Sequence, residues 1–313
     1  MIPVKNYYRI MAEAKSVYAE ECYQGGFIGA GWLTDIDLTG KFPDNWREFN
    51  KKFIPVYLEN RPGKSKIAAG LACGMLHTIC KGMRIDDLVL CPNGAGAYYV
   101  GEVTSDYHYA PGQTLPHRRD IQWYPELIER EDMSQALKNS AGSAGTVSNL
   151  TKYTEEIESL LSGNAPPDLI ASDADVEDPA VFALESHLED FLVKNWAATD
   201  LGNSYDIYEE EGELVGQQYP SDTGPMDILA ISKDNKELLV VELKKGRASD
   251  VVVGQIQRYM GYVIEELAES DQTVRGVIVA MEDDLRLRRA LKVTNNIDFY
   301  SYQVSFKLIK GQQ

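Results

Sequence analysis

The stretch PMDILAISKDNKELLVVELKKGRASDVVVGQIQRYMGY, residues 225–262, contains two apolar runs rich in β-branched side chains, at 226–231 and 238–243. A short polar segment separates the two runs, and this pattern predicts a β-hairpin. If Asp234 and Asn235 are the two turn residues, positions whose numbers add up to 469 face each other across the hairpin. The sequence therefore predicts a definite strand register as well as a fold element.

Three ionisable side chains converge at the end of this hairpin. The register places Asp227 opposite Glu242, and the period of two along a strand puts Lys244 on the same face as Glu242. Two close carboxylates repel each other unless a proton or cation lies between them, and a hard divalent ion prefers oxygen ligands. Lys244 would then orient or deprotonate a water and stabilise charge on a phosphate. The alternative is an ordinary charged strand end exposed to solvent.

A helix is expected directly after the hairpin, over residues 250–269, with Ser249 as its N-cap. Gln255, Tyr259 and Tyr262 follow the spacing i, i+4 and i+7, so they share one helical face. An amide and two phenols on one stripe suit a helix that borders a polar site, although a stripe of this kind also occurs in ordinary cores.

Together these features resemble the PD-(D/E)XK nuclease superfamily, which has an acid before a hairpin strand and then Glu-x-Lys, here Asp227 and Glu242-Leu243-Lys244. Gln255 and Tyr259 fit the Gln-x-x-x-Tyr motif of NucS-type endonucleases, and the segment Phe182-Ala183-Leu184-Glu185 resembles the acidic helix before their core. The resemblance covers residues 179–308 and implies an α/β sandwich that uses Mg²⁺ or Mn²⁺. It implies catalytic roles for Glu185, Asp227, Glu242, Lys244, Gln255 and Tyr259, with Glu185, Asp227 and Glu242 as metal ligands; Glu189, one turn after Glu185, is expected to be solvated.

The first half of the chain contains a glycine-rich apolar segment at 25–32 and further apolar runs at 87–91, 97–103 and 117–123. These segments look like the PUA/EVE-type β-barrel modules found in front of modification-dependent restriction nucleases. The resemblance implies a pocket that holds an extruded base, which needs stacking and hydrogen bonds to offset the cost of extrusion. Its stacking candidates are Trp32, Tyr107, Tyr109 and Trp123, and its phosphate-binding candidates are Arg118 and Arg119. Each of these aromatic residues also fits an ordinary core position.

The remaining elements follow from periodicity, caps and glycine or proline breaks. Helices are expected at 5–22, 46–53, 65–80, 151–161, 179–196 and 283–293; strands at 205–218, 274–281 and 297–309; and an exposed loop at 139–150. The segment SGNAPPDLIASDADVED, 162–178, combines paired prolines with acids and reads as a linker. We therefore expect a reader module at 1–160, an acidic linker at 161–178 and a nuclease domain at 179–313, that is, a mixed α/β (α+β) protein.

The formal net charge of −17 is unevenly distributed, with −1 over residues 1–150 and −16 over residues 151–313. A negative total disfavours nucleic acid as a partner, but a metal nuclease must itself carry a carboxylate cluster. The chain has no run of 18 apolar residues and no apolar signal segment at its start, so we expect a cytoplasmic protein away from membranes. The four cysteines form no Cys-x-x-Cys pair, which predicts free thiols.

These observations favour a metal-dependent DNA endonuclease of restriction or defence type, whose N-terminal module reads modified or abnormal DNA. A homodimer is a further expectation. The alternatives are a non-catalytic nucleic-acid-binding protein, a structure-specific DNA repair nuclease and an RNA-directed nuclease. The intact Asp, Glu and Lys argue against the first alternative, because a binding protein has no chemical need for that spacing.

Overall fold

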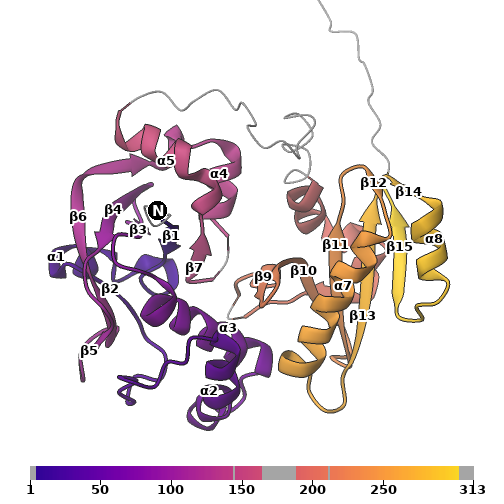
Figure 1. Cartoon of the computed structure of the whole chain (residues 1–313), viewed down its shortest axis with the longest axis horizontal. Helices are drawn as coiled ribbons and strands as arrows, with labels where there is room; N and C mark the ends of the chain where they lie inside the picture. Colours follow the sequence, from indigo (N-terminus) through magenta and orange to yellow (C-terminus); the bar gives the residue numbers. More distant parts are fainter. Residues whose placement is uncertain (1–4, 144, 164–187, 211, 303–313) are drawn as a thin grey trace, which may run out of the picture. The chain divides into compact units, whose positions relative to one another are not determined.

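The computed structural model describes residues 5–143, 145–163, 188–210 and 212–302. The chain divides into two compact units (Figure 1). The N-terminal unit comprises Met1–Ser172 with Glu210–Val215, and the C-terminal unit comprises Asp173–Glu209 with Gly216–Gln313. Each unit has its own sheet and its own core, and both combine helices with strands, which confirms the mixed α/β class.

The N-terminal unit is built on a seven-stranded sheet with the order β2-β6-β4-β3-β1-β7, in which β5 also pairs with β6. Only β1 and β3 are parallel neighbours, and the other pairs are antiparallel. The strands are β1 Tyr7–Ile10, β2 Phe27–Ala30, β3 Leu88–Pro92, β4 Ala97–Val103, β5 His108–Tyr109, β6 His117–Glu129 and β7 Val147–Asn149.

Helices cover both faces of this sheet (Figure 1). Side chains from α2 (Trp46–Asn60) and α3 (Lys66–His77) share a core cluster with Val89, whereas side chains from α4 (Gln135–Ala141) and α5 (Thr154–Leu161) share one with Leu90. Because successive side chains on a strand point to opposite faces, the two helix pairs lie on opposite sides of β3. The chain also forms α1 (Ala19–Gly25), and a π-helical turn at Thr78–Gly82 extends α3.

The helix expected at 5–22 is wrong. Tyr7–Ile10 forms β1, which pairs with β3 and β7, and only Ala19–Gly25 is α-helical in this part of the chain. All four β1 side chains are buried, so burial between two helix layers overrides the local helical pattern. The loop expected at 139–150 is also partly wrong, since α4 extends to Ala141 and β7 occupies Val147–Asn149.

The C-terminal unit has a six-stranded sheet with the order β15-β13-β11-β10-β8, in which β9 also pairs with β10. The strands are β8 Tyr205–Ile207, β9 Gln217–Ser221, β10 Gly224–Ser232, β11 Glu237–Leu243, β13 Thr273–Ala280 and β15 Ile297–Ser301. Strands β11, β13 and β15 run parallel, so their carboxyl ends meet at one edge of the sheet. A short parallel pair, β12 Arg247–Ala248 with β14 Glu282–Asp283, extends that edge.

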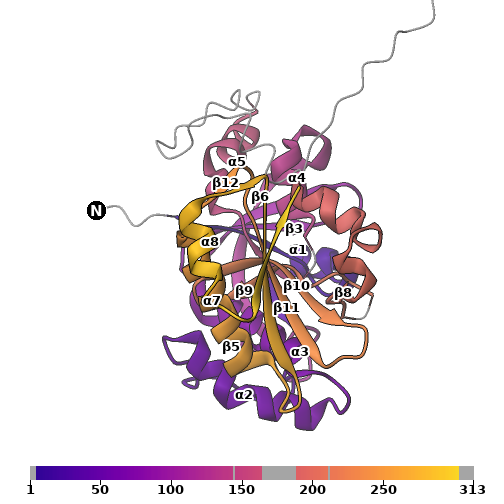
Figure 2. The same ribbon diagram turned by 90° about the vertical axis from the view of Figure 1, so that its right-hand side faces the viewer.

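Helices flank both faces of this sheet as well (Figure 2). Residues 188–194 are helical, and Leu188, Leu192 and Val193 pack on a core that contains Val277 and Val279 of β13. A Cβ atom built on Gly276 would instead meet Met260 and Ile256 of α7 (Val251–Tyr262), so α7 lies on the opposite face. Helix α8 (Leu285–Leu291) connects β14 to β15.

Two strand predictions for the C-terminal unit need correction. The strand expected at 205–218 is interrupted after Ile207 by an isolated bridge between Glu210 and Glu213, and the chain pairs again from Gln217. Gly212 has a φ of 82° in this segment, which suits a turn and not an extended strand. Strand β15 ends at Ser301, and residues 303–309 of the expected strand lie outside the described residues.

The prediction of free thiols is confirmed, because all four cysteines are free and buried. Within the described parts of the chain, none of the helices is both long enough and apolar enough to cross a bilayer.

Candidate active site

The hairpin forms with the expected register. Ile228 pairs with Val241 and Ile231 with Leu238, so the facing positions add up to 469 as predicted. The expected two-residue turn is wrong, because β10 ends at Ser232 and β11 begins at Glu237, so the loop spans residues 233–236. Asn235 takes the left-handed conformation with a φ of 61°, and the Ser232 hydroxyl accepts the backbone N–H of Glu237 at 2.9 Å. This register sets Asp227 and Glu242 at opposite positions, next to the Ile228–Val241 pair. Asp227 lies within β10, and Glu242 lies near the end of β11.

Glu242 and Lys244 form an ion pair at the carboxyl end of β11. Lys244 Nζ donates to Glu242 Oε1 at 2.6 Å, and the Glu242 side chain is 2% exposed while that of Lys244 is 34% exposed. The backbone N–H of Lys244 continues the parallel ladder by donating to Val279 O at 2.8 Å. The lysine therefore has a fixed backbone and a head group at the border between the interior and solvent, next to a buried carboxylate.

Asp227 is held by backbone and side-chain donors. Its Oδ2 accepts the backbone N–H of Leu243 at 2.7 Å, between Glu242 and Lys244, and its Oδ1 accepts from Gln218 Nε2 at 3.2 Å. Gln218 has a φ of 52°, a backbone conformation that is uncommon for a residue other than glycine. Strained backbone of this kind persists where surrounding contacts fix it, and here it directs the Gln218 amide toward Asp227.

Glu189 belongs to the same cluster, which corrects the expectation that this residue is solvated. Gln217 Nε2 donates to Glu189 Oε1 at 2.8 Å, and Gln218 Nε2 donates to Glu189 Oε2 at 2.6 Å. Burial and, to a smaller extent, the nearby charge of Asp227 raise the pKa of Glu189 to about 7, against the lowering effect of hydrogen bonds from the two glutamines. The sequence placed Glu189 one turn after Glu185 but gave no signal that Gln217 and Gln218 would fix it beside Asp227.

Gln255 and Tyr259 of α7 contact each other. Gln255 Nε2 donates to the hydroxyl of Tyr259 at 3.3 Å, and Tyr259 is 5% exposed. A Cβ atom built on Gly224 would lie 3.5 Å from that hydroxyl, so the phenol reaches the start of β10, three residues before Asp227. The sixth predicted residue, Glu185, lies outside the described residues.

The donor chemistry of this cluster fits a hard divalent cation. Asp227, Glu242 and Glu189 offer carboxylate oxygens, which Mg²⁺ and Mn²⁺ prefer. The pKa of Glu189 is raised mainly by burial and in part by the charge of Asp227, and a nearby cation would counter both effects. No group of three His, Cys, Asp or Glu side chains gathers at ligand spacing among the residues that the structure describes. The protein side chains present would therefore supply part of a coordination shell, as is usual for Mg²⁺, which keeps several waters.

The aromatic residues predicted for the N-terminal unit lie in two places. The Tyr107 hydroxyl pairs with His117 Nδ1 at 2.9 Å, and the Tyr109 ring lies 5.4 Å from the His117 ring. Trp123 packs against the same core cluster as Trp32 and Tyr107, but its ring contacts a different partner, since its centroid lies 6.0 Å from that of Tyr23 and its Nε1 donates to Cys22 O at 3.1 Å. Trp32 is partly buried against the core under α2 and α3. The ring contacts therefore do not unite Trp32 and Trp123 as two walls of one pocket.

The phosphate-binding role predicted for Arg118 and Arg119 is wrong for the described structure. Arg119 is 2% exposed and donates to the backbone oxygens of Ser105 at 2.7 Å and Met83 at 2.8 Å. Arg118 donates to Leu115 O at 3.0 Å and lies 3.7 Å from the centroid of the Phe27 ring. Both guanidinium groups are thus engaged in the fold and do not face a ligand.

Comparison with protein families divides the chain in the same place as its geometry. A family model described as the Endonuclease NucS C-terminal domain matches residues 184–303. The second half of the chain carries a NucS-like C-terminal domain. A separate model, described as Domain of unknown function (DUF8426), matches residues 8–151. The resemblance of this half to PUA/EVE-type modules stays a prediction.

A curated relative matches only part of the chain. Endonuclease NucS of Methanocaldococcus jannaschii is 33% identical over 90 residues, which make up 29% of this chain and 33% of that protein. The chain thus spans about a third of the curated relative that it matches.

Two solved structures are more distant. The crystal structure of a repair endonuclease from Pyrococcus abyssi has a TM-score of 0.31 and 17% identity, over 68% of this chain and 66% of that one. The structure of the EndoMS-dsDNA2 complex has a TM-score of 0.31 and 14% identity, over 67% and 62%. TM-scores this low support no conclusion about function.

Proposed function

We propose that the protein is a metal-dependent endonuclease that hydrolyses phosphodiester bonds in DNA. The observation that carries the proposal is the arrangement at the carboxyl end of β11, where Lys244 contacts the buried Glu242 and Asp227 accepts the N–H between them. The match of residues 184–303 to the NucS C-terminal domain supports it independently.

The side chains would divide the work as follows. Asp227, Glu242 and Glu189 would hold Mg²⁺ or Mn²⁺, which supplies a Lewis acid for the phosphoryl oxygen and lowers the pKa of a bound water. Lys244, partly exposed beside Glu242, is placed to orient the attacking water and to stabilise negative charge that develops on the phosphate. Gln255 and Tyr259 fix each other on α7 and support the start of β10, from which Asp227 projects.

The N-terminal unit would deliver the substrate. The C-terminal part has a charge of −16 over residues 151–313, so phosphate is repelled unless another part of the chain holds the DNA. We therefore propose that the N-terminal unit reads a modified or otherwise abnormal feature of DNA, in a restriction or defence system. Its near-neutral charge of −1 and its half-buried tyrosines and tryptophans are compatible with this role.

Plasmid cleavage tests the proposal directly. The full chain is incubated with supercoiled plasmid, methylated or unmethylated, in the presence of Mg²⁺, Mn²⁺ or EDTA. We expect nicked or linear product only with a divalent ion and more product from one of the two plasmids. Absence of cleavage under every metal condition would refute the endonuclease, whereas equal cleavage of both plasmids would refute the reader of methylation alone.

The oligomeric state is a second part of the proposal. Cutting both strands of a duplex needs two active sites or two successive events, so we propose a homodimer on DNA. Sedimentation of the full chain with and without a short duplex measures this, and a complex with one copy of the chain per duplex would contradict it.

A further inference from the structure

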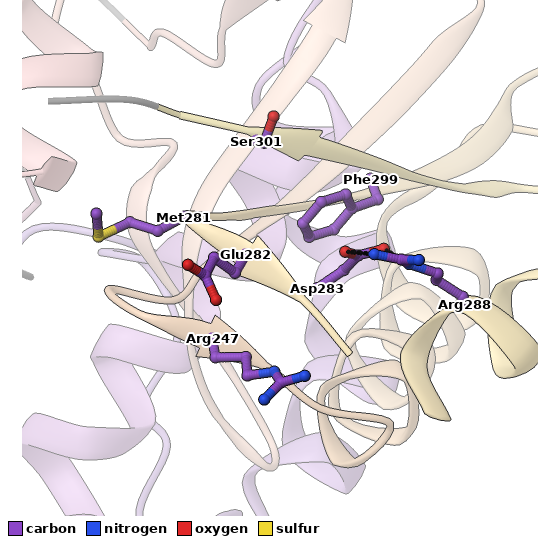
Figure 3. Close-up of a pocket in the computed structure, with 7 residues that line it drawn as sticks. All are labelled: Arg247, Met281, Glu282, Asp283, Arg288, Phe299 and Ser301. Atoms are coloured by element: carbon purple, nitrogen blue, oxygen red, sulfur yellow. Dashed lines mark hydrogen bonds and ion pairs between the residues drawn. The ribbon is translucent and has the colours of Figure 1, made fainter. Parts of the chain in front are cut away.

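A hollow of about 480 Å³ opens at the edge of the C-terminal sheet, beyond the candidate active site (Figure 3). Its walls come from β12, β14, α8 and β15, and Figure 3 shows the Phe299 ring facing the space between Arg247 and Ser301. Phe299 is half-buried, while Arg247, Glu282 and Ser301 are exposed.

The hollow lies on the same strand edge as the catalytic candidates. The hydrogen bonds between β11 and β13 extend into the pair β12 and β14. Lys244 N donates to Val279 O, Met281 N donates to Gly246 O at 3.0 Å, and Arg247 then pairs with Glu282. Arg247 follows Lys244 by three residues, which corresponds to roughly 10 Å along an extended chain. A nucleotide strand whose phosphate lies at Lys244 would therefore pass this hollow within one or two nucleotides.

Two of the four charges around the hollow neutralise each other. Arg288 donates to Asp283 through Nε at 2.5 Å and through Nη2 at 2.8 Å, and this pairing lowers the pKa of Asp283. Arg247 and Glu282 remain, with the Ser301 hydroxyl. Within the described part of the chain none of these three side chains makes a hydrogen bond or a close ion pair; Arg247 has only a longer-range attraction to Asp283.

This combination selects among ligand classes. A free anion would be repelled by the Glu282 carboxylate, and a free cation would be repelled by Arg247, because the Arg288–Asp283 pair adds no net charge. An apolar ligand would leave the charged groups without partners. A nucleotide offers a partner for each of these groups. Its base has a flat face that can stack on Phe299, an exocyclic amine can donate to the Glu282 carboxylate, and its phosphate can bind Arg247.

We propose that this hollow receives one unpaired nucleotide of the DNA strand being cut, and that it prefers a base with an exocyclic amino group. Phe299 stacks on the base, Glu282 accepts a hydrogen bond from the amine, and Arg247 contacts the phosphate. The inference rests on the proposed endonuclease function and adds a specificity site to it. The nucleotide must be unpaired, because Glu282 reaches the Watson–Crick edge only after the base has left the duplex.

Binding of two homopolymers tests the proposal. The full chain is titrated in EDTA with fluorescently labelled 12-nucleotide oligo(dC) and oligo(dT), which differ at ring position 4 by an amine or a carbonyl. We expect oligo(dC) to bind about 10- to 100-fold more tightly, the ratio that one hydrogen bond to a charged acceptor provides. Glu282→Gln should abolish or reverse this preference, because an amide can donate to the thymine carbonyl.

The aromatic wall is tested with a matched control on the next residue of the same strand. Phe299→Ala should weaken binding of both oligonucleotides by about 5- to 150-fold through lost stacking. Tyr300→Ala removes a ring that is 38% exposed and does not line the hollow, and it should leave both affinities unchanged. Phe299→Leu keeps apolar volume without the ring, so a folded Phe299→Leu protein with weakened binding excludes unfolding as the cause.

The outcomes separate this inference from the proposed function. If the wild-type chain cleaves plasmid with Mg²⁺ but the Phe299 and Glu282 variants bind both oligonucleotides like wild type, the nucleotide site is refuted and the endonuclease stands. If the wild-type chain neither cleaves nor binds DNA, both fail together. Free dCMP that binds as tightly as oligo(dC) would overturn the assignment to a DNA strand.

Discussion

The buried charged side chains of the two units have different kinds of hydrogen-bond partner. In the N-terminal unit, Arg9 and Arg119 are almost fully buried, and their guanidinium groups donate mainly to backbone carbonyls. In the C-terminal unit, the carboxylates of Glu189 and Asp227 share the donor Gln218, and the buried Glu242 takes Lys244. Hydrogen bonds to carbonyl oxygens fix an arginine side chain in place. Crowded carboxylates carry negative charge that a bound cation can balance.

This difference teaches where to look for chemistry. A buried arginine that meets only carbonyls stabilises one conformation and has no group left for a substrate. A buried carboxylate cluster contains groups that gain or lose a proton near neutral pH, as the pKa of about 7 for Glu189 shows, and such groups are typical of functional sites. The buried arginines therefore stabilise the fold, the crowded acids are the candidates for catalysis, and four predictions test this contrast.

The largest effect is expected at the carboxylate cluster. Asp227→Asn keeps an oxygen for the Leu243 N–H but removes the charge, so we expect cleavage to fall by at least about 10²- to 10⁴-fold. The melting temperature should hold or rise slightly, because repulsion with Glu189 is relieved. Plasmid cleavage and calorimetry on the same preparation measure both, and wild-type cleavage rates would remove Asp227 from the site.

The opposite pattern is expected at the buried arginine. Arg119→Met should lower the stability of the N-terminal unit by about 3–5 kcal/mol, because several buried carbonyl oxygens lose their donor. Lys51→Met, an exposed position on α2, serves as the control and should change stability little. Denaturant unfolding measures the difference. A stable Arg119→Met protein with weakened DNA binding would restore the phosphate-binding role.

A smaller effect is expected at the tryptophans of the N-terminal unit. If Trp32 stacks on a flipped base, Trp32→Ala should weaken binding of the preferred DNA by about 5- to 150-fold, with little effect on plain duplex. Trp123 contacts Tyr23 and donates to Cys22 O, so Trp123→Ala should mainly lower the stability of the N-terminal unit. Melting temperature measured beside both affinities separates packing from recognition, and equal behaviour of the two variants would contradict the division into two aromatic groups.

The smallest effect concerns protonation of the N-terminal core. Burial lowers the pKa of His117, whose ring nitrogens contact the Tyr107 hydroxyl and Leu33 O. Because the unfolded chain binds the proton more readily, the stabilising contribution is present above pH 6.5 and is lost as the pH falls toward the lowered value, by about 1.4 kcal/mol per pH unit. His117→Gln should flatten this slope in unfolding titrations from pH 7.5 to 5, and an unchanged slope would show that His117 does not cause it.

The sequence by itself determined the hairpin of β10 and β11. The placement of the apolar runs on either side of the loop at 233–236 fixed the register, because a shift by one residue would turn the apolar side chains outward. That register alone brought Asp227 opposite Glu242 and put Lys244 on the same face. The helix α7 and the strands β3, β4 and β13 also followed from local periodicity and breaks. The expected N-cap is wrong, because Asp250 and not Ser249 stands before α7, and its side chain makes no capping hydrogen bond.

Only the tertiary structure decided which side chains belong to the carboxylate cluster and which are buried in the core of the N-terminal unit. Glu189 became part of the cluster because β9 brings Gln217 and Gln218 to it, and Arg119 became structural because carbonyls from the end of α3 surround it. Residues 7–10 became a strand because two neighbouring strands offered hydrogen bonds between two helix layers. The local sequence determines the hydrophobic periodicity of each element and the residues of each turn. The partners of a buried polar group come from segments distant in the chain, and only the complete tertiary structure brings them together.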